Sequence, residues 1–142
     1  MITINDPVLF DANILINFKG QLKFLFQFFE NIIIHRQVYE EVIGQPLKDE
    51  MESISDKSKI KIVEDNFPTD YAGKSLLEEC KKELKDSFNI DDLKDLGEYK
   101  TLLFAKFNNV CILSSQDTTV WRFITESKYF KGLKCITIQD FA

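Results

Sequence analysis

Acidic side chains stand at the ends of several apolar segments of this sequence. A carboxylate inside an apolar run is costly to bury unless something pairs with it. Oxygen ligands with no Cys or His nearby suit Mg²⁺ or Mn²⁺, and such ions activate water and neutralise charge in phosphodiester cleavage. The candidate residues for this chemistry are Asp11, Glu41, Glu98 and Asp117.

Each of these residues also has a structural interpretation, and the sequence leaves both open. Asp11 and Asp117 can cap the helices that follow them, and Glu41 can be ordinary helix surface. The segment Asp95-Leu-Gly-Glu98 fits a capping box, with an acidic N-cap and Glu three residues later. Only the common placement of the four residues favours a shared site.

The elements that must position these residues can be read from hydrophobic patterns. Short apolar runs predict strands at 8–10, 32–34, 110–113 and 135–138, with a further strand or extended segment at 60–63. Helical patterns occupy 12–29 in two stretches, 38–44 with Gly44 as C-cap, 71–86 after Pro68, 95–107 and 118–125. We therefore expect an α/β fold, a three-layer α/β/α sandwich with a mainly parallel sheet, as one domain over residues 1–142.

The order of the elements places the acidic residues at one edge of the predicted sheet. In an open parallel sheet the functional crevice lies outside the carboxyl ends of the strands. Asp11 follows the first strand, Glu41 comes soon after the second, and Asp117 follows the 110–113 strand. We expect their carboxyl groups, with that of Glu98, to converge on one or two hydrated Mg²⁺ ions.

Composition sets broad bounds on the protein class. The chain has 142 residues, 44% of them hydrophobic and 29% charged, which is typical of a soluble globular domain. No segment has the length and apolarity of a membrane span, and the N-terminus lacks a signal peptide, so we expect a cytoplasmic protein. Three widely spaced Cys predict neither a disulfide framework nor a zinc site. A net charge of −5 argues against a strongly basic nucleic-acid surface but does not exclude a nucleic-acid enzyme.

Four segments together resemble the PIN-domain family of metal-dependent nucleases. They are VLFDANILI near the start, VYEEV after the second predicted strand, DLGEYKTLLFAK on a predicted helix and ILSSQD at a strand end. The resemblance spans roughly residues 6–126 and is closest to the toxin-type (VapC-like) members with a Gly-Glu third motif.

The resemblance implies a fold, an activity and a set of residues. It implies a hydrolase, a Mg²⁺- or Mn²⁺-dependent endoribonuclease that cleaves RNA and is held inactive as a toxin by a cognate antitoxin. The four acidic positions of the family match Asp11, Glu41 (with Glu40 as the exposed alternative), Glu98 and Asp117, of which Asp11, Glu98 and Asp117 would bind the metal. Supporting roles fall to Asn13, Asp95 and Ser115.

Two departures from the family and two other functions remain to be weighed. The fourth motif, SSQD, is looser than in many members and implies weaker metal binding, and the chain ends directly after the last predicted strand, as in a short member or a truncated chain. The alternative function is a non-catalytic PIN-like module that binds RNA or a protein partner through a degenerate site. A phosphorylated receiver domain ranks last, because the acidic pair and the late Lys of that fold are missing.

Other residues carry weaker signals. His35, the only histidine, favours a structural role over general-base catalysis. Arg122 can contact a substrate phosphate or lie on the helix surface, and we expect Lys81, Lys82 and Lys85 to form a solvated helix face. Phe24 and Phe28 lie on a second apolar face of their helix, which predicts a contact with a second copy or with the antitoxin.

Overall fold

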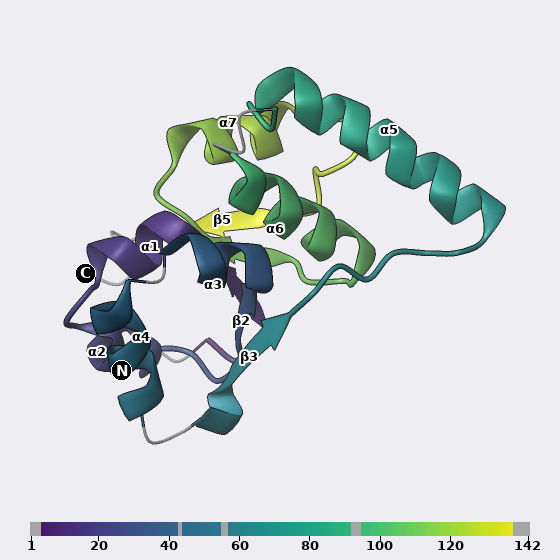
Figure 1. Cartoon of the computed structure of the whole chain (residues 1–142). Helices are drawn as coiled ribbons and strands as arrows, with labels where there is room; N and C mark the ends of the chain where they lie inside the picture. The colour runs from purple at the N-terminus through teal and green to yellow at the C-terminus, as the bar shows by residue number, and fades with distance from the viewer. Residues whose placement is uncertain (1–3, 43, 55–56, 92–94, 138–142) are drawn as a thin grey trace.

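The protein folds around a five-stranded sheet in which neighbouring strands are parallel (Figure 1). The computed structural model describes residues 4–42, 44–54, 57–91 and 95–137. The strands are β1 (Val8–Phe10), β2 (Ile32–His35), β3 (Ile60–Val63), β4 (Ile112–Ser114) and β5 (Lys134–Ile136). Their order across the sheet is β3-β2-β1-β4-β5, so the first strand of the chain lies at the centre.

Helices cover both faces of this sheet. They are α1 (Ala12–Asn17), α2 (Leu22–Phe26), α3 (Arg36–Val42), α4 (Gln45–Ser53), α5 (Tyr71–Ser87), α6 (Leu96–Phe107) and α7 (Thr118–Glu126), with a short 3₁₀ helix, η1 (Lys57–Lys59). The helices α5, α6 and α7 lie together on one side in Figure 1, and α1, α2 and α4 gather on the other. The predicted α/β/α sandwich with a parallel sheet is confirmed.

The hydrophobic core divides in two because successive strand residues point to opposite faces. Leu9 packs with buried residues of α5, α6 and α7 in one cluster. Its neighbours Val8 and Phe10 pack in the other cluster, with residues of α1, α2 and α4. All three residues are fully buried, as expected for a central strand covered on both sides.

The crossover connections reverse direction next to β1. The connections from β1 to β2 and from β2 to β3 run through the helices of one face, and those from β3 to β4 and from β4 to β5 run through the helices of the other. The loops that follow β1 and β4 therefore separate at the middle of the sheet. Ligands of open α/β sheets bind at this kind of switch point, outside the carboxyl ends of the strands.

Most predicted elements are present, with shifted ends. The 8–10 strand has its predicted bounds, and the 60–63 segment is a full strand. The predicted 110–113 strand begins two residues later than expected, as β4. The predicted 135–138 strand begins one residue earlier, as β5, and residue 138 lies outside the described residues. The 71–86 helix begins at Tyr71 after Asp70, whose carboxylate caps it by accepting from the Gly73 N–H at 3.1 Å.

One prediction about residues 38–54 was wrong, and one helix in this range was not predicted. The polar segment after Gly44 forms α4, which has Pro46 in its first turn, a favoured position for proline. Gly44 is accordingly the N-cap of α4 rather than a C-cap. Polar composition concealed α4, because it buries only a narrow stripe that includes Leu47 and Met51.

The helix α2 leaves an aromatic side chain in solvent. It ends at Phe26 rather than continuing to residue 29. Phe24 is 58% exposed and packs edge-to-face on the partly buried Phe28, with ring centroids 5.4 Å apart. The expected contact of this face with a second copy or an antitoxin stays a prediction.

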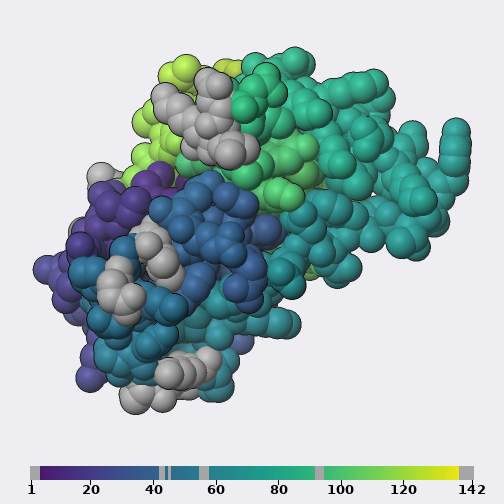
Figure 2. Space-filling model, in the orientation of Figure 1, coloured from purple at the N-terminus to yellow at the C-terminus, as the bar shows by residue number. Residues whose placement is uncertain are grey.

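The helix α5 extends beyond the rest of the domain. Figure 2 shows its first turns standing out from the body of the molecule. Its second half packs into the core through Leu77, Cys80 and Leu84, and Tyr71 at its start is 90% exposed. Within the described ranges, none of the helices combines the length and the apolar content that crossing a bilayer requires.

Candidate active site

Asp11 is buried at the point where β1 and β4 end side by side. Its backbone N–H donates to the Ser114 carbonyl at 3.0 Å, which ties the two strand ends together. Its carboxylate accepts from the Ala12 N–H at 2.7 Å and from the Ser115 hydroxyl at 2.8 Å, and it is the N-cap of α1. Asp11 therefore has the predicted capping role, and the second lone pair of each oxygen remains for a further ligand.

The loop after β4 is fixed to α1 by side-chain hydrogen bonds. Asn13 accepts from the Gln116 N–H at 3.0 Å and donates to the Ser115 hydroxyl at 3.4 Å. The Ser115 hydroxyl also accepts from the Asp117 N–H at 3.1 Å. Asp117 caps α7 through the Thr119 N–H at 2.8 Å. Asn13 and Ser115 thus hold Asp11 and Asp117 in one constellation.

Glu98 reaches the same region from α6. Asp11 and Glu98 both line a small cavity of about 10 Å³, which also has apolar walls. The Glu98 Oε2 atom is buried and has no hydrogen-bond partner among the described residues. A buried, unpaired carboxylate oxygen is unfavourable, so this atom is suited to receive a ligand.

The capping box at the start of α6 does not form. Asp95 is the N-cap of α6 but makes no side-chain cap bond. Its carboxylate accepts instead from the Asn89 N–H at 2.7 Å, and its own N–H donates to the Asn89 carbonyl at 3.0 Å. The structural interpretation of Glu98 is therefore wrong, and its side chain is left for another role.

Glu41 reaches α6 from α3 because residue 97 is glycine. A Cβ atom at Gly97 would lie 2.4 Å from Glu41 Oε2, closer than carbon and oxygen approach each other. Gln37 donates to Glu41 Oε1 at 3.3 Å. The Glu41 carboxyl group therefore lies directly against the first turn of α6, one residue before Glu98. Its neighbour Glu40 is exposed.

Burial and mutual repulsion raise the pKa values of these carboxyl groups. Burial raises the pKa of Asp11 to about 6, with further increases from the charges of Asp117 and Glu41. Burial raises the pKa of Glu98 to about 8, helped by the charges of Asp11, Asp95 and Glu41. Partial burial likewise raises the pKa of Glu41, and Asp95 adds to this effect. The charged groups that shift the pKa values of Asp11 and Glu98 are thus all carboxylates. A cation bound among them would be favourable, because it would offset their repulsion.

The acidic residues lie close enough to interact electrostatically, but they do not form a ready ligand set. Among the residues that the structure describes, no three Asp, Glu, His or Cys side chains are arranged to hold a metal ion. Like charges separate in the absence of a cation. The donor set itself, all oxygen with one unpaired buried carboxylate atom, fits a hard cation such as Mg²⁺ or Mn²⁺.

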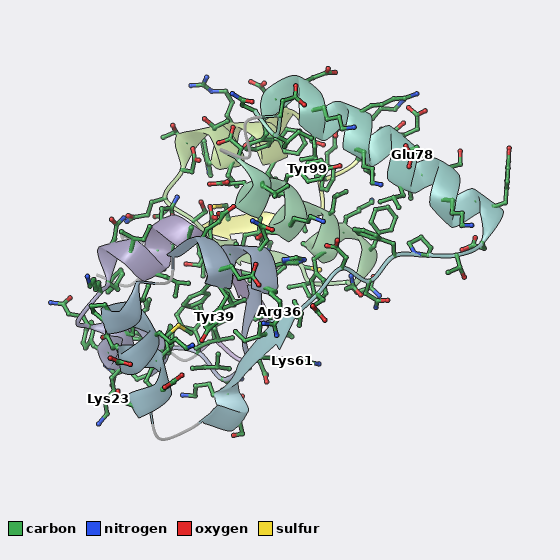
Figure 3. The ribbon with its side chains drawn as sticks, viewed as in Figure 1. Lys23, Arg36, Tyr39, Lys61, Glu78 and Tyr99 are labelled. Carbon is green, nitrogen blue, oxygen red and sulfur yellow. The ribbon has the colours of Figure 1, made fainter. Side chains whose placement is uncertain are left out.

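His35 has a structural role beside this crevice. Its Nδ1 accepts from the Gln37 N–H at 3.0 Å, so the proton lies on Nε2, which contacts Asp65 Oδ1 at 2.9 Å. Lys100 of α6 completes the cluster with a 2.6 Å ion pair to Asp65. Burial lowers the pKa of His35 despite its acidic partner. The cluster links the ends of β2 and β3 to α6. Arg36, which is labelled in Figure 3, forms an ion pair with Glu64 at 3.4 Å.

The other singled-out residues lie on the surface or away from the crevice. Trp121 is 56% exposed and Arg122 is exposed, both on α7. Lys81 and Lys82 pair with Glu78 and Glu79 on α5 at 3.6 and 3.7 Å, in keeping with the expected solvated face. Figure 3 shows Glu78 on α5 and Tyr99 on α6.

Two residues of the site region escaped the sequence analysis. Gly97 was seen only as part of a motif, although the sequence signal, a glycine within a helical pattern, could have indicated a close approach. Thr101 lines the cavity of Asp11 and Glu98 but gives no sequence signal, because a threonine in an apolar helix resembles ordinary core.

The comparisons with known proteins give no relative: the sequence matches no protein-family model, and no curated protein matches it.

Glu98 makes the stability of the ion-free protein depend on pH. Its pKa is higher in the folded protein than its ordinary value of 4.5, so the folded state binds the extra proton and loses stability as pH rises towards 8. We expect Glu98→Gln to remove most of the fall in unfolding free energy between pH 6.5 and 8.5. Urea unfolding in EDTA at both pH values measures this, and an equally steep fall in the variant would contradict it.

Gly97 should control the environment of Glu41. In Gly97→Ala the new methyl group displaces the Glu41 carboxyl group towards water, so the pKa of Glu41 should fall towards its ordinary value. Alanine is also the better helix former by about 1 kcal/mol, so the fold should persist. Side-chain carboxyl NMR titration measures the pKa. Gly132→Ala, where the added Cβ meets nothing within 4 Å, is the matched control and should leave Glu41 unchanged.

Proposed function

We propose that this protein is a Mg²⁺- or Mn²⁺-dependent endoribonuclease of the PIN type. The observation that carries the proposal is the group of carboxyl groups at the switch point of the sheet, which raise one another's pKa values. The resemblance of the four sequence segments to PIN-domain nucleases supports the same function. Under this proposal Asp11, Glu98 and Asp117 hold the cation.

Under this proposal each residue of the site has its own role. A bound Mg²⁺ or Mn²⁺ supplies positive charge and lowers the pKa of water at the scissile phosphate. Ser115 orients Asp11 by donating to its carboxylate, and Asn13 fixes the loop that carries Asp117. Under the proposal Glu98, whose Oε2 atom has no hydrogen-bond partner among the described residues, is one of the cation's ligands.

Glu41 has a different part from the three ligands. It is the most exposed of the four carboxylates, and its raised pKa brings it closer to neutral pH. A carboxylate with these properties can accept the proton that water loses when it attacks the phosphorus. Gly97 and Gln37 keep its carboxyl group at the rim of the crevice.

The biological role proposed is that of a toxin controlled by a cognate antitoxin. This part rests on the sequence resemblance. The exposed Phe24 with Phe28 offers apolar surface for the antitoxin or for a second copy in a homodimer.

A second candidate is a non-catalytic PIN-like module that binds RNA or a protein partner. The separated carboxylates, which form no ready metal group among the described residues, favour it. Under this alternative the crevice would bind its partner without cleaving it.

Substitution of Asp11 tests the nuclease. Asn keeps the size of the side chain and can still cap α1, but it removes a ligand charge and the repulsion from Asp117 and Glu41. Asp11→Asn should therefore abolish RNA cleavage, leave the fold intact and stabilise the ion-free protein. The measurements are cleavage of mixed single-stranded oligoribonucleotides with Mn²⁺ and with EDTA, and urea unfolding of both proteins.

The outcomes of this experiment separate the two candidates. Cleavage by the wild type in EDTA excludes the proposed mechanism, and so does cleavage by the Asp11→Asn variant. Folded wild-type protein that binds the oligoribonucleotides with Mn²⁺ and leaves them uncut favours the binding module.

Trp121 provides a binding measurement that does not depend on cleavage. It is the single tryptophan of the chain, and its backbone N–H donates to the Asp117 carbonyl at 3.2 Å, in the first turn of α7. Helical side chains lean towards the N-terminus of their helix, so the indole leans towards Asp117. Single-stranded RNA that binds the Asp11→Asn protein in the presence of Mn²⁺ should quench the fluorescence of Trp121, because a base stacks on its indole ring. Unchanged fluorescence with an RNA that the wild type cleaves would place the substrate elsewhere.

A further inference from the structure

The strand β3 forms one edge of the sheet (Figure 1). It pairs with β2 over residues 60–63, and among the described residues no strand lies on its other side. A strand at an edge directs part of its backbone N–H and C=O groups away from the sheet, where they can pair with another chain. The edge is therefore open to an extended segment.

A groove beside this edge exposes apolar surface. It has a volume of about 160 Å³ and is lined by Ile60 and Ile62 of β3, Tyr39 of α3, and Met51 and Glu52 of α4. This volume is several times the roughly 30 Å³ that one water occupies in the liquid, so this β3 groove has room for an apolar side chain. Both isoleucines are partly exposed, and covering them would remove apolar surface from water.

A lysine lies on the other face of the same strand. Ile60 and Ile62 pack against one core cluster and Val63 against the other. Side chains of a strand alternate between the two faces of the sheet, so Lys61 lies on the face opposite the β3 groove. Lys61 is exposed, and Figure 3 labels it on β3 together with Tyr39 of the groove.

These features fit a segment whose side chains alternate apolar, acidic and apolar. Side chains directly opposite each other in paired strands lie on the same face and interact. Two apolar side chains of such a segment would lie beside Ile60 and Ile62 at the β3 groove, and the acidic one beside Lys61. The exposed carboxylate of Glu52 would repel an acidic side chain at the groove, so the acidic residue belongs on the lysine face.

A second copy of this chain fits the edge less well. Lysine on an edge strand is a common protection against the pairing of identical edges. Two β3 strands paired antiparallel about Lys61 would bring two lysines directly opposite each other, which is destabilising. The lysine thus opposes self-pairing, but it favours a strand that carries an acidic residue at this position. Protection from self-pairing alone does not explain the apolar groove next to the strand.

We propose that the β3 edge and the β3 groove bind an extended segment of another protein, apolar and acidic in alternation, which adds a strand to the sheet. Backbone hydrogen bonds to β3 supply affinity, and the groove and Lys61 select the side chains. The inference is independent of the proposed cation site, because none of these residues belongs to that site.

An NMR titration of the isotope-labelled full chain tests the selection of side chains. The peptide Ser-Thr-Ile-Glu-Ile-Thr-Ser should shift the backbone amide resonances of residues 60–63, and the shifts give its affinity. Lys61→Glu should weaken the binding of this peptide about fivefold, and it should strengthen to a similar degree the binding of the matched peptide with Lys in place of Glu.

Two further variants separate the groove from the charge. Ile62→Thr keeps a β-branched side chain but places a hydroxyl at the β3 groove, so it should weaken the binding of both peptides. Lys131→Glu is the matched control for charge, because Lys131 is exposed, lies outside β3 and its replacement changes the net charge by the same amount. It should leave both affinities unchanged.

Peptides methylated at alternate backbone nitrogens test strand addition itself. In a strand added at an edge, one set of alternate amides faces the sheet and the other faces solvent. Methylation of one set should therefore abolish binding, and methylation of the other set should preserve it. Equal binding of the two methylated peptides would overturn strand addition.

Two other results would overturn the proposal. The first is the absence of shifts at residues 60–63 with millimolar peptide. The second is self-association of the wild type that Lys61→Glu changes, measured by analytical ultracentrifugation, because the occupant of the edge would then be a second copy of this chain.

Discussion

The hydrogen bond from Ser115 to Asp11 is the interaction on which the site depends. Asp11 belongs to the end of the central strand, where apolar residues surround it, and a carboxylate there is unfavourable unless it is solvated by the protein. Ser115 and the Ala12 N–H supply that solvation at 2.8 and 2.7 Å. The same serine accepts from Asp117, so the bond that makes Asp11 tolerable also sets the start of α7. Burial of one carboxylate thereby organises both loops at the middle of the sheet.

Several carboxyl groups that destabilise one another's charged form lie around this bond. Asp11 follows β1, Glu41 lies near the end of α3 and Glu98 lies in the first turn of α6. Beyond the effect of burial, the charge of Glu41 raises the pKa of Asp11, and the charges of Asp11 and Glu41 raise the pKa of Glu98. Elsewhere the fold pairs its buried charge, as in the His35, Asp65 and Lys100 cluster, where hydrogen bonds from Lys100 and His35 outweigh burial and lower the pKa of Asp65. Each cluster includes one residue of α6, Glu98 in the first and Lys100 in the second. Carboxyl groups with raised pKa values gather at functional sites in many proteins, which makes the first cluster the candidate site.

The sequence predicted the sheet well because its strands are continuous apolar runs. β1 needed no adjustment, since Val8, Leu9 and Phe10 are buried on both faces of the sheet. The helix α4 was missed because it covers an edge of the core with few apolar residues. The acidic residues were proposed as a site because they come after strands or near helix ends in the sequence, which the order of the elements indicates. Three features depend on packing between α3, α6 and β4, which residue patterns do not encode. They are the lack of a ready ligand set, the close approach at Gly97 and the unpaired Thr101 hydroxyl.

The position of β1 at the centre of the sheet has a consequence for synthesis of the chain. Asp11 and Ser115 are 104 residues apart, and one neighbour of β1 in the sheet, β4, is made after β2 and β3. Contacts of such long range form slowly because a long loop must close first. At translation rates of roughly 5–20 residues per second, the growing chain passes several seconds with Asp11 made and its partner serine absent. The hydrogen bond between Asp11 and Ser115 therefore forms only after Ser115 has been made, and until then a nascent chain carries Asp11 without this partner.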